Sequence, residues 1–344
     1  MRIAVVTSSP PMSEGGHMVI ARALVQALRD AGHDADRVVT PQNRFGRQAS
    51  AYAATWLTDV TTGDGRPIDR VISLRYPSYA VRHPHHVCWL NHTMREYYDL
   101  WDRFSATLSP QGLLKERVRR TVIHAADRYL LTRNVRRLFV QSRTIQARLT
   151  MWPELHSTVL YPPAPGRGYR CDDYGDYIFM VSRLTALKRA ELLVRAAAAP
   201  EGRGIRAVIA GDGEERGPLQ QLIDDLAVGD RVRLAGRLSA EDLLAHLARC
   251  RAVCFPPRSE DYGLVTVEAF ASRKAVITCR DSGGPAELVE DGVQGFVCDP
   301  TPAALATALQ QVIADRELAE RLGGQAHARG ARLTWEETVK QLTG

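Results

Sequence analysis

Several features that mark common protein classes are missing from this chain. No apolar run is long enough to span a membrane. The start of the chain (Met1–Thr7) is too short for the apolar region of a signal peptide and has no cleavage site. No basic tract with interleaved aromatic residues suggests a nucleic-acid groove. We therefore expect a cytoplasmic protein, soluble or peripherally attached to a membrane, that does not bind nucleic acid.

The cysteines lack the spacing of metal ligands. Of the six, at positions 88, 171, 250, 254, 279 and 298, only Cys250 and Cys254 stand close together, and neither a second pair nor a histidine tandem lies nearby. We expect reduced, mostly buried thiols and no metal site.

The composition is that of a globular enzyme. At 344 residues, with 45% hydrophobic and 24% charged side chains, two domains are expected. Lysine occurs only at positions 115, 188, 274 and 340, so the net charge of +6 comes almost wholly from arginine. This charge suits anionic ligands or anionic lipid surfaces.

Short apolar runs alternate with helical patterns along the first half. A strand at Ile3–Val6, a glycine-containing loop over residues 8–16 and a helix at His17–Asp30 are typical of a parallel α/β domain. A Gly-, Pro- and Asp-rich linker begins at Tyr161. The other elements expected are strands Ala35–Val39, Val71–Leu74, Val87–Leu90, Leu138–Val140 and Thr158–Leu160 and a helix at Leu113–Thr132.

The alternation restarts after the linker. We expect strands Tyr177–Val181, Ala207–Ala210, Val232–Leu234, Val253–Phe255 and Ala275–Thr278, and helices Ala190–Ala199, Glu215–Ala227, Ala240–Cys250 and Leu264–Ser272. Two doubly wound domains facing each other would form a cleft at the carboxyl ends of their strands, where such sheets bind ligands.

The segment Ser259–Glu268 carries two acids on either side of a glycine. If Gly263 opens a helix, the first backbone N–H groups, near Leu264 and Val265, favour an anion, while Glu260 and Glu268 can accept hydrogen bonds from hydroxyls. A solvated loop acid and a surface helix acid are the alternative.

Three further groups of residues lie at expected strand ends or at the start of a helix. Arg183 and Lys188 can converge on a diphosphate, although two surface cations would give the same pattern. Gly15 and Gly16 open the first helix and can admit an anion. His92, near Arg95, follows a strand and suits a polyol or acidic acceptor, unless it is a structural loop histidine.

Together these motifs resemble the retaining, nucleotide-sugar-dependent glycosyltransferases of family 4, which have the GT-B fold of two Rossmann-like domains. The resemblance covers most of residues 177–300 and is weaker over residues 1–165. It rests on Val181–Lys188, Ala210–Gly213, Glu260-x₇-Glu268, Asp281–Val289 and Asp291–Gly295. One departure is Arg273, where the family often has a small residue or glycine.

The resemblance implies the domain organisation. Residues 1–165 would be the N-terminal acceptor-binding domain and residues 166–330 the C-terminal donor-binding domain. Residues 331–344 would form a helix that crosses back to the first domain.

The resemblance also implies roles for individual residues. Arg183 and Lys188 would bind the donor diphosphate and stabilise its growing charge without a metal ion. Glu260 would hold the transferred sugar, Glu268 the ribose, and His92 would lie at the reacting centre. The donor site would also include Gly15, Gly16, Arg237, Tyr262, Gly263, Leu264 and Val265, and the acceptor site His92 and Arg95.

The reaction implied is retaining transfer of a hexose-type sugar from a nucleotide-diphosphate sugar, UDP- or GDP-linked, to a hydroxyl acceptor. The acceptor would be a saccharide, a lipid-linked saccharide or a small molecule. Front-side displacement is expected, with no cofactor beyond the co-substrate. The alternatives are a nucleotide-sugar epimerase or hydrolase, a non-catalytic nucleotide-sugar-binding module, and a glycan phosphorylase with Lys188 carrying pyridoxal phosphate.

Overall fold

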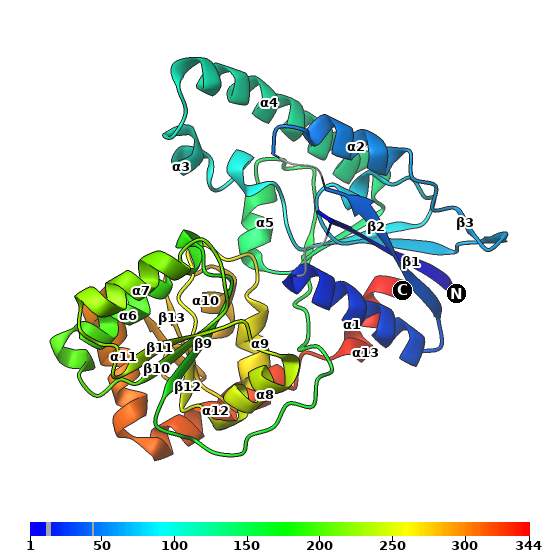
Figure 1. The fold of residues 1–344 in the computed structure, drawn as a ribbon. Coiled ribbons are helices and arrows are strands. Elements are labelled where there is room, and N and C mark those ends of the chain that lie inside the picture. The colour runs from blue at the N-terminus through cyan, green and yellow to red at the C-terminus, as the bar shows by residue number, and fades with distance from the viewer. Residues whose placement is uncertain (12–14, 43–44) are drawn as a thin grey trace. The chain divides into compact units, whose positions relative to one another are not determined.

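The computed structural model describes residues 1–11, 15–42 and 45–344. The expected loop over residues 8–16 therefore lies partly outside the described residues. The chain divides into two compact units. Unit 1 comprises Met1–Pro162 and Thr334–Gly344, and unit 2 comprises Pro163–Leu333 (Figure 1). Boundaries near residues 165 and 330 were expected.

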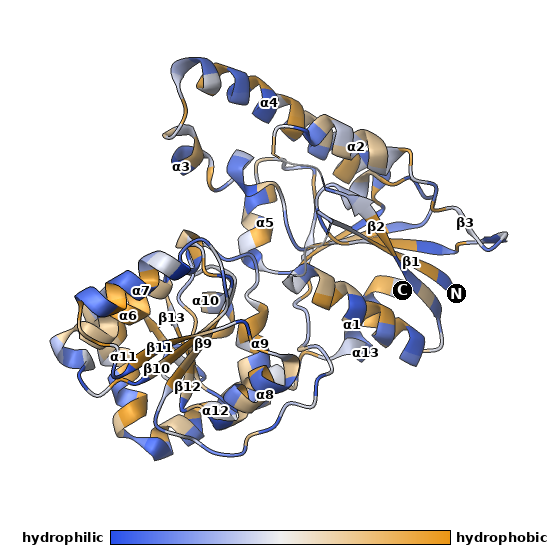
Figure 2. Cartoon of the chain, in the orientation of Figure 1, coloured by the Kyte–Doolittle hydropathy of each residue, from blue (hydrophilic) through white to orange (hydrophobic). Residues whose placement is uncertain are grey.

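Unit 1 is built on a parallel six-stranded sheet in the order β2-β1-β5-β6-β7-β8. The strands are short and mostly buried, which explains why they read as apolar runs (Figure 2). A small antiparallel hairpin, β3 (Thr62–Gly63) and β4 (Arg66–Pro67), lies outside this sheet. The sheet strands are β1 (Arg2–Ser9), β2 (Asp34–Pro41), β5 (Arg70–Ser73), β6 (His86–Leu90), β7 (Arg137–Val140) and β8 (Thr158–Val159).

The helices of unit 1 include several that the sequence patterns did not locate, among them α2, α3 and α5. Helix α4 begins at Pro110, earlier than the expected Leu113, because the Ser109 hydroxyl accepts a 3.2 Å hydrogen bond from the Gly112 N–H. The helices are α1 (Gly16–Asp30), α2 (Gln48–Trp56), η1 (Ser78–Ala80), η2 (Arg95–Tyr97), α3 (Trp101–Ser105), α4 (Pro110–Tyr129), the π-helical turn η3 (Leu130–Asn134) and α5 (Arg143–Leu149).

The last helix, α13 (Trp335–Thr343), packs within unit 1 against α1. Its Trp335 ring lies edge-on to Trp89 of β6, with centroids 6.2 Å apart. Arg70 donates a 2.9 Å hydrogen bond to the Leu342 carbonyl, which satisfies one of the carbonyl groups that a helix end leaves free.

Unit 2 repeats the design with a second parallel sheet in the order β11-β10-β9-β12-β13-β14. Its strands are β9 (Ile178–Val181), β10 (Ala207–Ala210), β11 (Val232–Gly236), β12 (Ala252–Cys254), β13 (Val276–Cys279) and β14 (Gly295–Cys298). The edge strand β14 was not located from the sequence.

Helices cover both faces of the second sheet (Figure 1). Their apolar side chains form one core with the strands, in which Ile178, Leu193, Ile209 and Leu309 are fully buried. The helices are η4 (Ala186–Lys188), α6 (Ala190–Ala198), η5 (Pro200–Gly202), α7 (Arg216–Asp225), α8 (Ala240–Arg249), α9 (Leu264–Ala271), α10 (Gly284–Leu288), α11 (Pro302–Ala314) and α12 (Arg316–Gly330). Of these, α11 and α12 were not located in advance.

Most of the thiols are buried, as the sequence predicted. All six cysteines are free, and Cys88, Cys250, Cys254 and Cys279 are buried. Among the described residues no group of three or more His, Cys, Asp and Glu side chains could hold a metal ion. No helix in the described part of the chain is long and apolar enough to cross a membrane.

Candidate functional site in unit 2

The candidate site lies at the carboxyl edge of the second sheet. Strands β9, β12 and β13 are adjacent and parallel, so the loops that follow them meet at this edge. The loop after β9 contains Arg183 and Lys188, and the loop after β12 contains Glu260. The loop after β13 contains Asp281 and Gly283. The topology therefore brings together residues that are separated by up to about a hundred positions in the sequence.

Glu260 is fixed to the neighbouring loop through its backbone. Its N–H donates a 2.8 Å hydrogen bond to the Ser282 carbonyl, and its own carbonyl accepts a 2.9 Å bond from the Gly284 N–H. The preceding residue, Ser259, bonds to the Asp281 carbonyl in the same way and has a φ of 51°. A non-glycine residue in this left-handed region costs on the order of 1 kcal/mol or more, and such residues cluster at functional sites.

Two glycines allow this close packing of loops. At Gly283, which has a φ of 72°, a Cβ would lie 2.5 Å from the Glu260 carbonyl oxygen. At Gly263, which has a φ of 79°, a Cβ would lie 2.6 Å from Cγ of Pro285. A side chain at either position would push the Glu260 loop away from the loop that follows β13.

Lys188, which is expected to bind the donor diphosphate, and Glu260, which is expected to hold the transferred sugar, form an ion pair. Nζ of Lys188 lies 2.6 Å from Oε2 of Glu260, and both side chains are 20% exposed. The ammonium group also lies over the Phe255 ring, 5.5 Å from its centroid. Arg183 is exposed, and its guanidinium has no ion-pair partner within residues 1–11, 15–42 and 45–344. One cation is therefore held beside Glu260 and a second is open to solvent.

Arg189, which the sequence patterns did not single out, connects the three loops. It follows Lys188 with a φ of 51°, and its side chain is buried. Its guanidinium donates to the Pro256 and Pro257 carbonyls at 2.7 Å each and forms two bonds, of 2.7 and 2.9 Å, with the Asp281 carboxylate. Such a planar fork suits a paired carboxylate. Arg189 therefore ties the start of α6 to the loops after β12 and β13.

Glu268 lies inside helix α9 and is 4% exposed. Its Oε1 accepts hydrogen bonds from the Tyr169 hydroxyl at 3.0 Å and from Nη1 of Arg167 at 3.1 Å. Burial raises the pKa of Glu268, and the neighbouring Arg167 and Tyr169 oppose this rise. Both partners belong to the linker that the sequence identified only by its glycines, prolines and aspartates.

The start of α9 leaves backbone N–H groups without intrahelical partners, and their expected role in anion binding stays a prediction. The Thr266 N–H donates to the Gly263 carbonyl, and the N–H groups of Leu264 and Val265 precede the first intrahelical bonds. Leu264 and Val265 are half-buried, whereas Tyr262 is buried. Arg237 lies elsewhere on this edge, after β11, with an 83% exposed side chain 3.5 Å from Asp212.

The candidate residues of unit 1 lie near the carboxyl ends of β1 and β6. Gly15 has an extended backbone and caps α1, and Gly16 is its first residue, with open space where a Cβ would be. His92 follows β6 and is half-buried. Arg95 is buried, and its guanidinium contacts Asp99 at 2.7 Å. Its expected role in acceptor binding stays a prediction.

The residue expected to depart from the family pattern has an unusual backbone. Arg273 stands on the turn after α9 with a φ of 57°. Glycine adopts this conformation without steric cost, which accounts for a glycine at such a turn. The turn lies at the opposite end of α9 from Gly263.

Part of the chain is similar to proteins of a known family. Residues 170–329 match the family model described as glycosyl transferases group 1. The alpha-D-kanosaminyltransferase of Streptomyces kanamyceticus is 35% identical over 153 residues, which cover 43% of this chain and 39% of that protein. The chain thus spans about two fifths of the length of this curated relative.

Two solved structures resemble the whole chain. Sucrose-phosphate synthase from Thermosynechococcus elongatus has a TM-score of 0.75 at 19% identity, covering 99% of this chain and 97% of the other. Anabaena HepE, solved in complex with UDP and glucose, has a TM-score of 0.69 at 18% identity, covering 99% and 98%. The chain therefore has the GT-B fold of two Rossmann-like units, and residues 170–329 of unit 2 match the group 1 glycosyl transferases.

Proposed function

We propose that this protein is a retaining glycosyltransferase that moves a hexose-type sugar from a nucleotide-diphosphate sugar to a hydroxyl acceptor. The observation that carries the proposal is the match of residues 170–329 to the glycosyl transferases group 1. That range contains Arg183, Lys188, Glu260 and Glu268. The HepE structure holds UDP and glucose, so UDP-glucose is the first donor to test, followed by GDP-linked sugars.

The geometry of unit 2 supports specific roles for the charged side chains. Arg183 and Lys188 would stabilise the diphosphate as negative charge grows on it, in place of a metal ion. Glu260 would accept hydrogen bonds from the transferred sugar. The Lys188–Glu260 ion pair keeps both groups ordered before the donor arrives, which lowers the entropy lost on binding. The nucleotide sugar is a co-substrate, and no further cofactor is proposed.

The proposed chemistry is a front-side displacement. The acceptor hydroxyl forms the new bond on the face that the diphosphate leaves, and a phosphate oxygen of the donor takes the hydroxyl proton. Glu260 is therefore assigned to binding rather than to a covalent intermediate. Unit 1 is proposed to bind a saccharide, lipid-linked saccharide or small-molecule acceptor, with His92 and Arg95 as candidate contacts and Gly15 and Gly16 as phosphate contacts.

A thermal-shift screen with UDP-, GDP-, ADP- and dTDP-sugars tests the donor assignment, because a ligand that binds only the folded state raises the melting temperature. Donors that shift it are then incubated with a panel of acceptors. Transfer to an acceptor with retained configuration is expected. Free nucleotide and free sugar formed without any acceptor dependence would instead indicate a hydrolase, and binding without turnover a non-catalytic module.

A further inference from the structure

Helix α4 has an apolar side that the described residues of its unit leave exposed. Leu114, Val118 and Val122 are 67%, 60% and 63% exposed, and Tyr129 is 57% exposed. Their spacing places them on one line along the 20-residue helix. The opposite side of α4 packs into the core through Ile123. We call the four exposed side chains the α4 stripe.

The acidic residues of α4 lie on its buried side, and its exposed charged residues are basic. Both of its acidic residues are buried: Glu116 accepts from the Tyr97 hydroxyl at 2.7 Å, and Asp127 is surrounded by tyrosine hydroxyls. The exposed charged residues, Lys115, Arg117 and Arg128, are all cations. At about 100° of rotation per residue, Arg117 and Arg128 lie on one side of the α4 stripe and Lys115 on the other.

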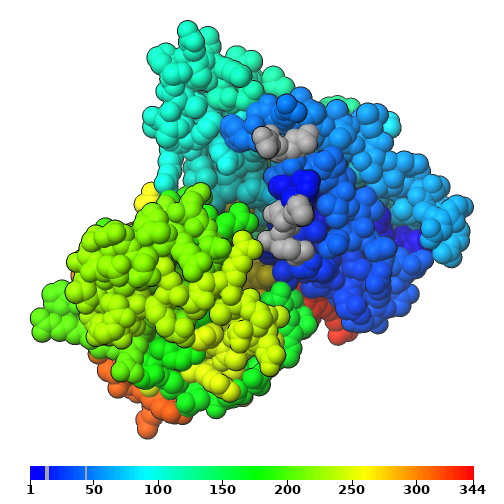
Figure 3. Space-filling view, viewed as in Figure 1, coloured from blue at the N-terminus to red at the C-terminus, as the bar shows by residue number. Residues whose placement is uncertain are grey.

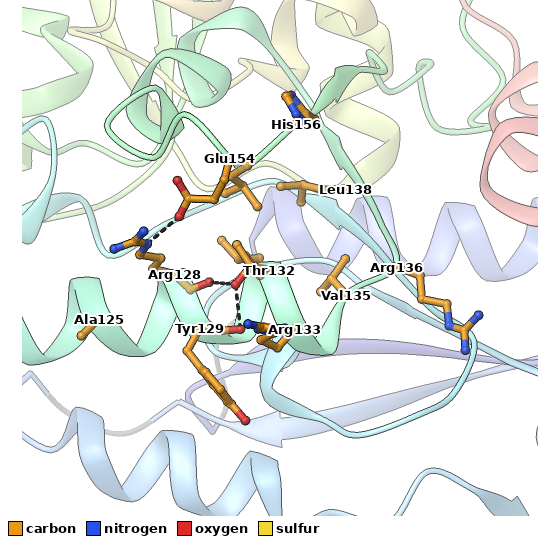
Figure 4. A pocket seen from close by; sticks show the side chains of 12 residues that line it. Ala125, Arg128, Tyr129, Thr132, Arg133, Val135, Arg136, Leu138, Glu154 and His156 are labelled. Carbon is orange, nitrogen blue, oxygen red and sulfur yellow. Dashed lines mark hydrogen bonds and ion pairs between the residues drawn. The ribbon is translucent and has the colours of Figure 1, made fainter.

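A basic cavity of about 760 Å³ lies at the carboxyl end of α4 (Figure 4). Arg128, Arg133, Arg136 and His156 are among its lining residues. Arg128 is paired with Glu154 at 2.5 Å, whereas Arg133 and Arg136 have no ion-pair partner in the part of the chain that the structure describes. The apolar stripe therefore ends beside guanidinium groups that are able to bind a phosphate.

We propose that α4 binds an anionic membrane surface, with the α4 stripe inserted between lipid headgroups and the flanking cations contacting lipid phosphates. An exposed apolar line bordered by Lys and Arg is the pattern of helices that lie in a membrane interface. In the space-filling view the segment that contains α3 and α4 lies at the surface of the molecule (Figure 3). This inference goes beyond sugar transfer and does not rest on it.

Charge selects the lipid surface over a second copy of the chain. Two copies meeting through α4 would bring Lys115, Arg117 and Arg128 against the same cations of the partner, and like charges repel. An anionic bilayer instead neutralises them while it takes up the apolar side chains. The buried positions of Glu116 and Asp127 remove the repulsion that exposed carboxylates would cause.

The test is co-sedimentation of the full chain with vesicles. Vesicles of phosphatidylcholine mixed with phosphatidylglycerol should bind the protein, and phosphatidylcholine vesicles should not. Binding should weaken as salt is raised, because the attraction is screened. Leu114→Ser/Val118→Ser/Val122→Ser should lower the bound fraction about tenfold or more. Val39→Ser, at a 45% exposed position on β2, is the matched control and should bind like the wild type.

A charge-reversed variant and a measurement of the molecular mass in solution complete the test. Lys115→Glu/Arg117→Glu keeps the α4 stripe and should abolish the preference for phosphatidylglycerol, which tests the proposal even if the triple variant unfolds. Equal binding of the wild type and this charge-reversed variant overturns the proposal, as does failure of the wild type to bind anionic vesicles. If the mass in solution shows that the wild type is a dimer and the triple variant a monomer, α4 is instead a contact between two copies of the chain.

Discussion

Tyr169 donates a 3.0 Å hydrogen bond to Oε1 of Glu268, so a linker residue holds the carboxylate that we assign to the ribose. Arg167 contacts the same oxygen at 3.1 Å. Oε2 has no hydrogen-bond partner among the described residues. The linker therefore orients Glu268 while one oxygen stays available to accept from the two hydroxyls of a ribose.

Replacing Tyr169 with phenylalanine should weaken the binding of UDP more than that of 2′-deoxy-UDP. A misoriented Glu268 loses contacts with both ribose hydroxyls of UDP but only with the single remaining 3′-hydroxyl of 2′-deoxy-UDP. A hydrogen bond contributes about 1 kcal/mol, so the ratio of the two dissociation constants should change by about fivefold. Isothermal titration calorimetry measures both constants.

Tyr177→Phe is the matched control for this experiment. Tyr177 stands at the amino end of β9, and its hydroxyl lies 3.1 Å from Nδ1 of His246, so this variant removes a comparable hydrogen bond at the other edge of the sheet. Its UDP to 2′-deoxy-UDP ratio should equal that of the wild type. An equal loss of affinity for both nucleotides in Tyr169→Phe would assign Tyr169 to folding alone.

Arg167→Gln should move the acidic limb of the pH profile to higher pH. Burial raises the pKa of Glu268, and Arg167 counteracts this by favouring the ionised carboxylate. Without Arg167 the carboxylate protonates at higher pH, and the neutral acid accepts hydrogen bonds from the ribose hydroxyls more weakly. The measurement is kcat/KM against pH with a saturating acceptor, and an unmoved limb would show that Glu268 does not titrate in the active range.

Lys188→Ala and Arg183→Ala should each lower the transfer rate about a hundredfold or more, because each removes a cation that stabilises charge in the transition state. Glu260→Ala should have a similar effect through the lost sugar contact. Arg206→Ala is the control, since this arginine pairs with Asp176 on an exposed surface. Melting temperatures should stay close to that of the wild type, and near-normal turnover of Lys188→Ala contradicts the diphosphate assignment.

The sequence predicted most of the sheet strands because buried parallel strands are short apolar runs, as at Ile178–Val181. The edge strand Gly295–Cys298 was not predicted, because it is only half-buried and lies within a glycine-containing motif. The roles of Arg189 and Tyr169 were not predicted for a different reason. Their roles depend on partners that only the fold brings near, namely Asp281 for Arg189 and Glu268 for Tyr169.

Arg189→Ala should destabilise unit 2 by about 1–3 kcal/mol, the typical effect of leaving buried acceptors without their donor; the ion pair adds less than a buried pair would, because the Asp281 side chain is 40% exposed. The change leaves Asp281 and two proline carbonyls without their donor. Arg206→Ala breaks an exposed ion pair with Asp176 and should cost about 0–1 kcal/mol. Urea unfolding curves give both values, and similar losses in the two variants would show that Arg189 does not tie the loops together.

Asp127 should make the stability of unit 1 depend on pH. This carboxylate is buried and accepts hydrogen bonds from the hydroxyls of Tyr52, Tyr79 and Tyr98. Burial raises its pKa to about 6, from an ordinary value of 3.8, although the tyrosine hydrogen bonds favour the ionised form. Between these two values the folded state binds more protons than the unfolded state, so the free energy of unfolding falls as pH rises through this window.

A shift of this size corresponds to roughly 3 kcal/mol, fully present below pH 4 and lost above about pH 6. Asp127→Asn cannot titrate, so the difference in unfolding free energy between wild type and variant should change by that amount across the window. Asp102→Asn, at an exposed position on α3, controls for the general effect of losing a carboxylate and should show no such change. Denaturant unfolding measured at several pH values tests this, and a pH-independent difference for Asp127→Asn means that its carboxyl group keeps an ordinary pKa despite its burial.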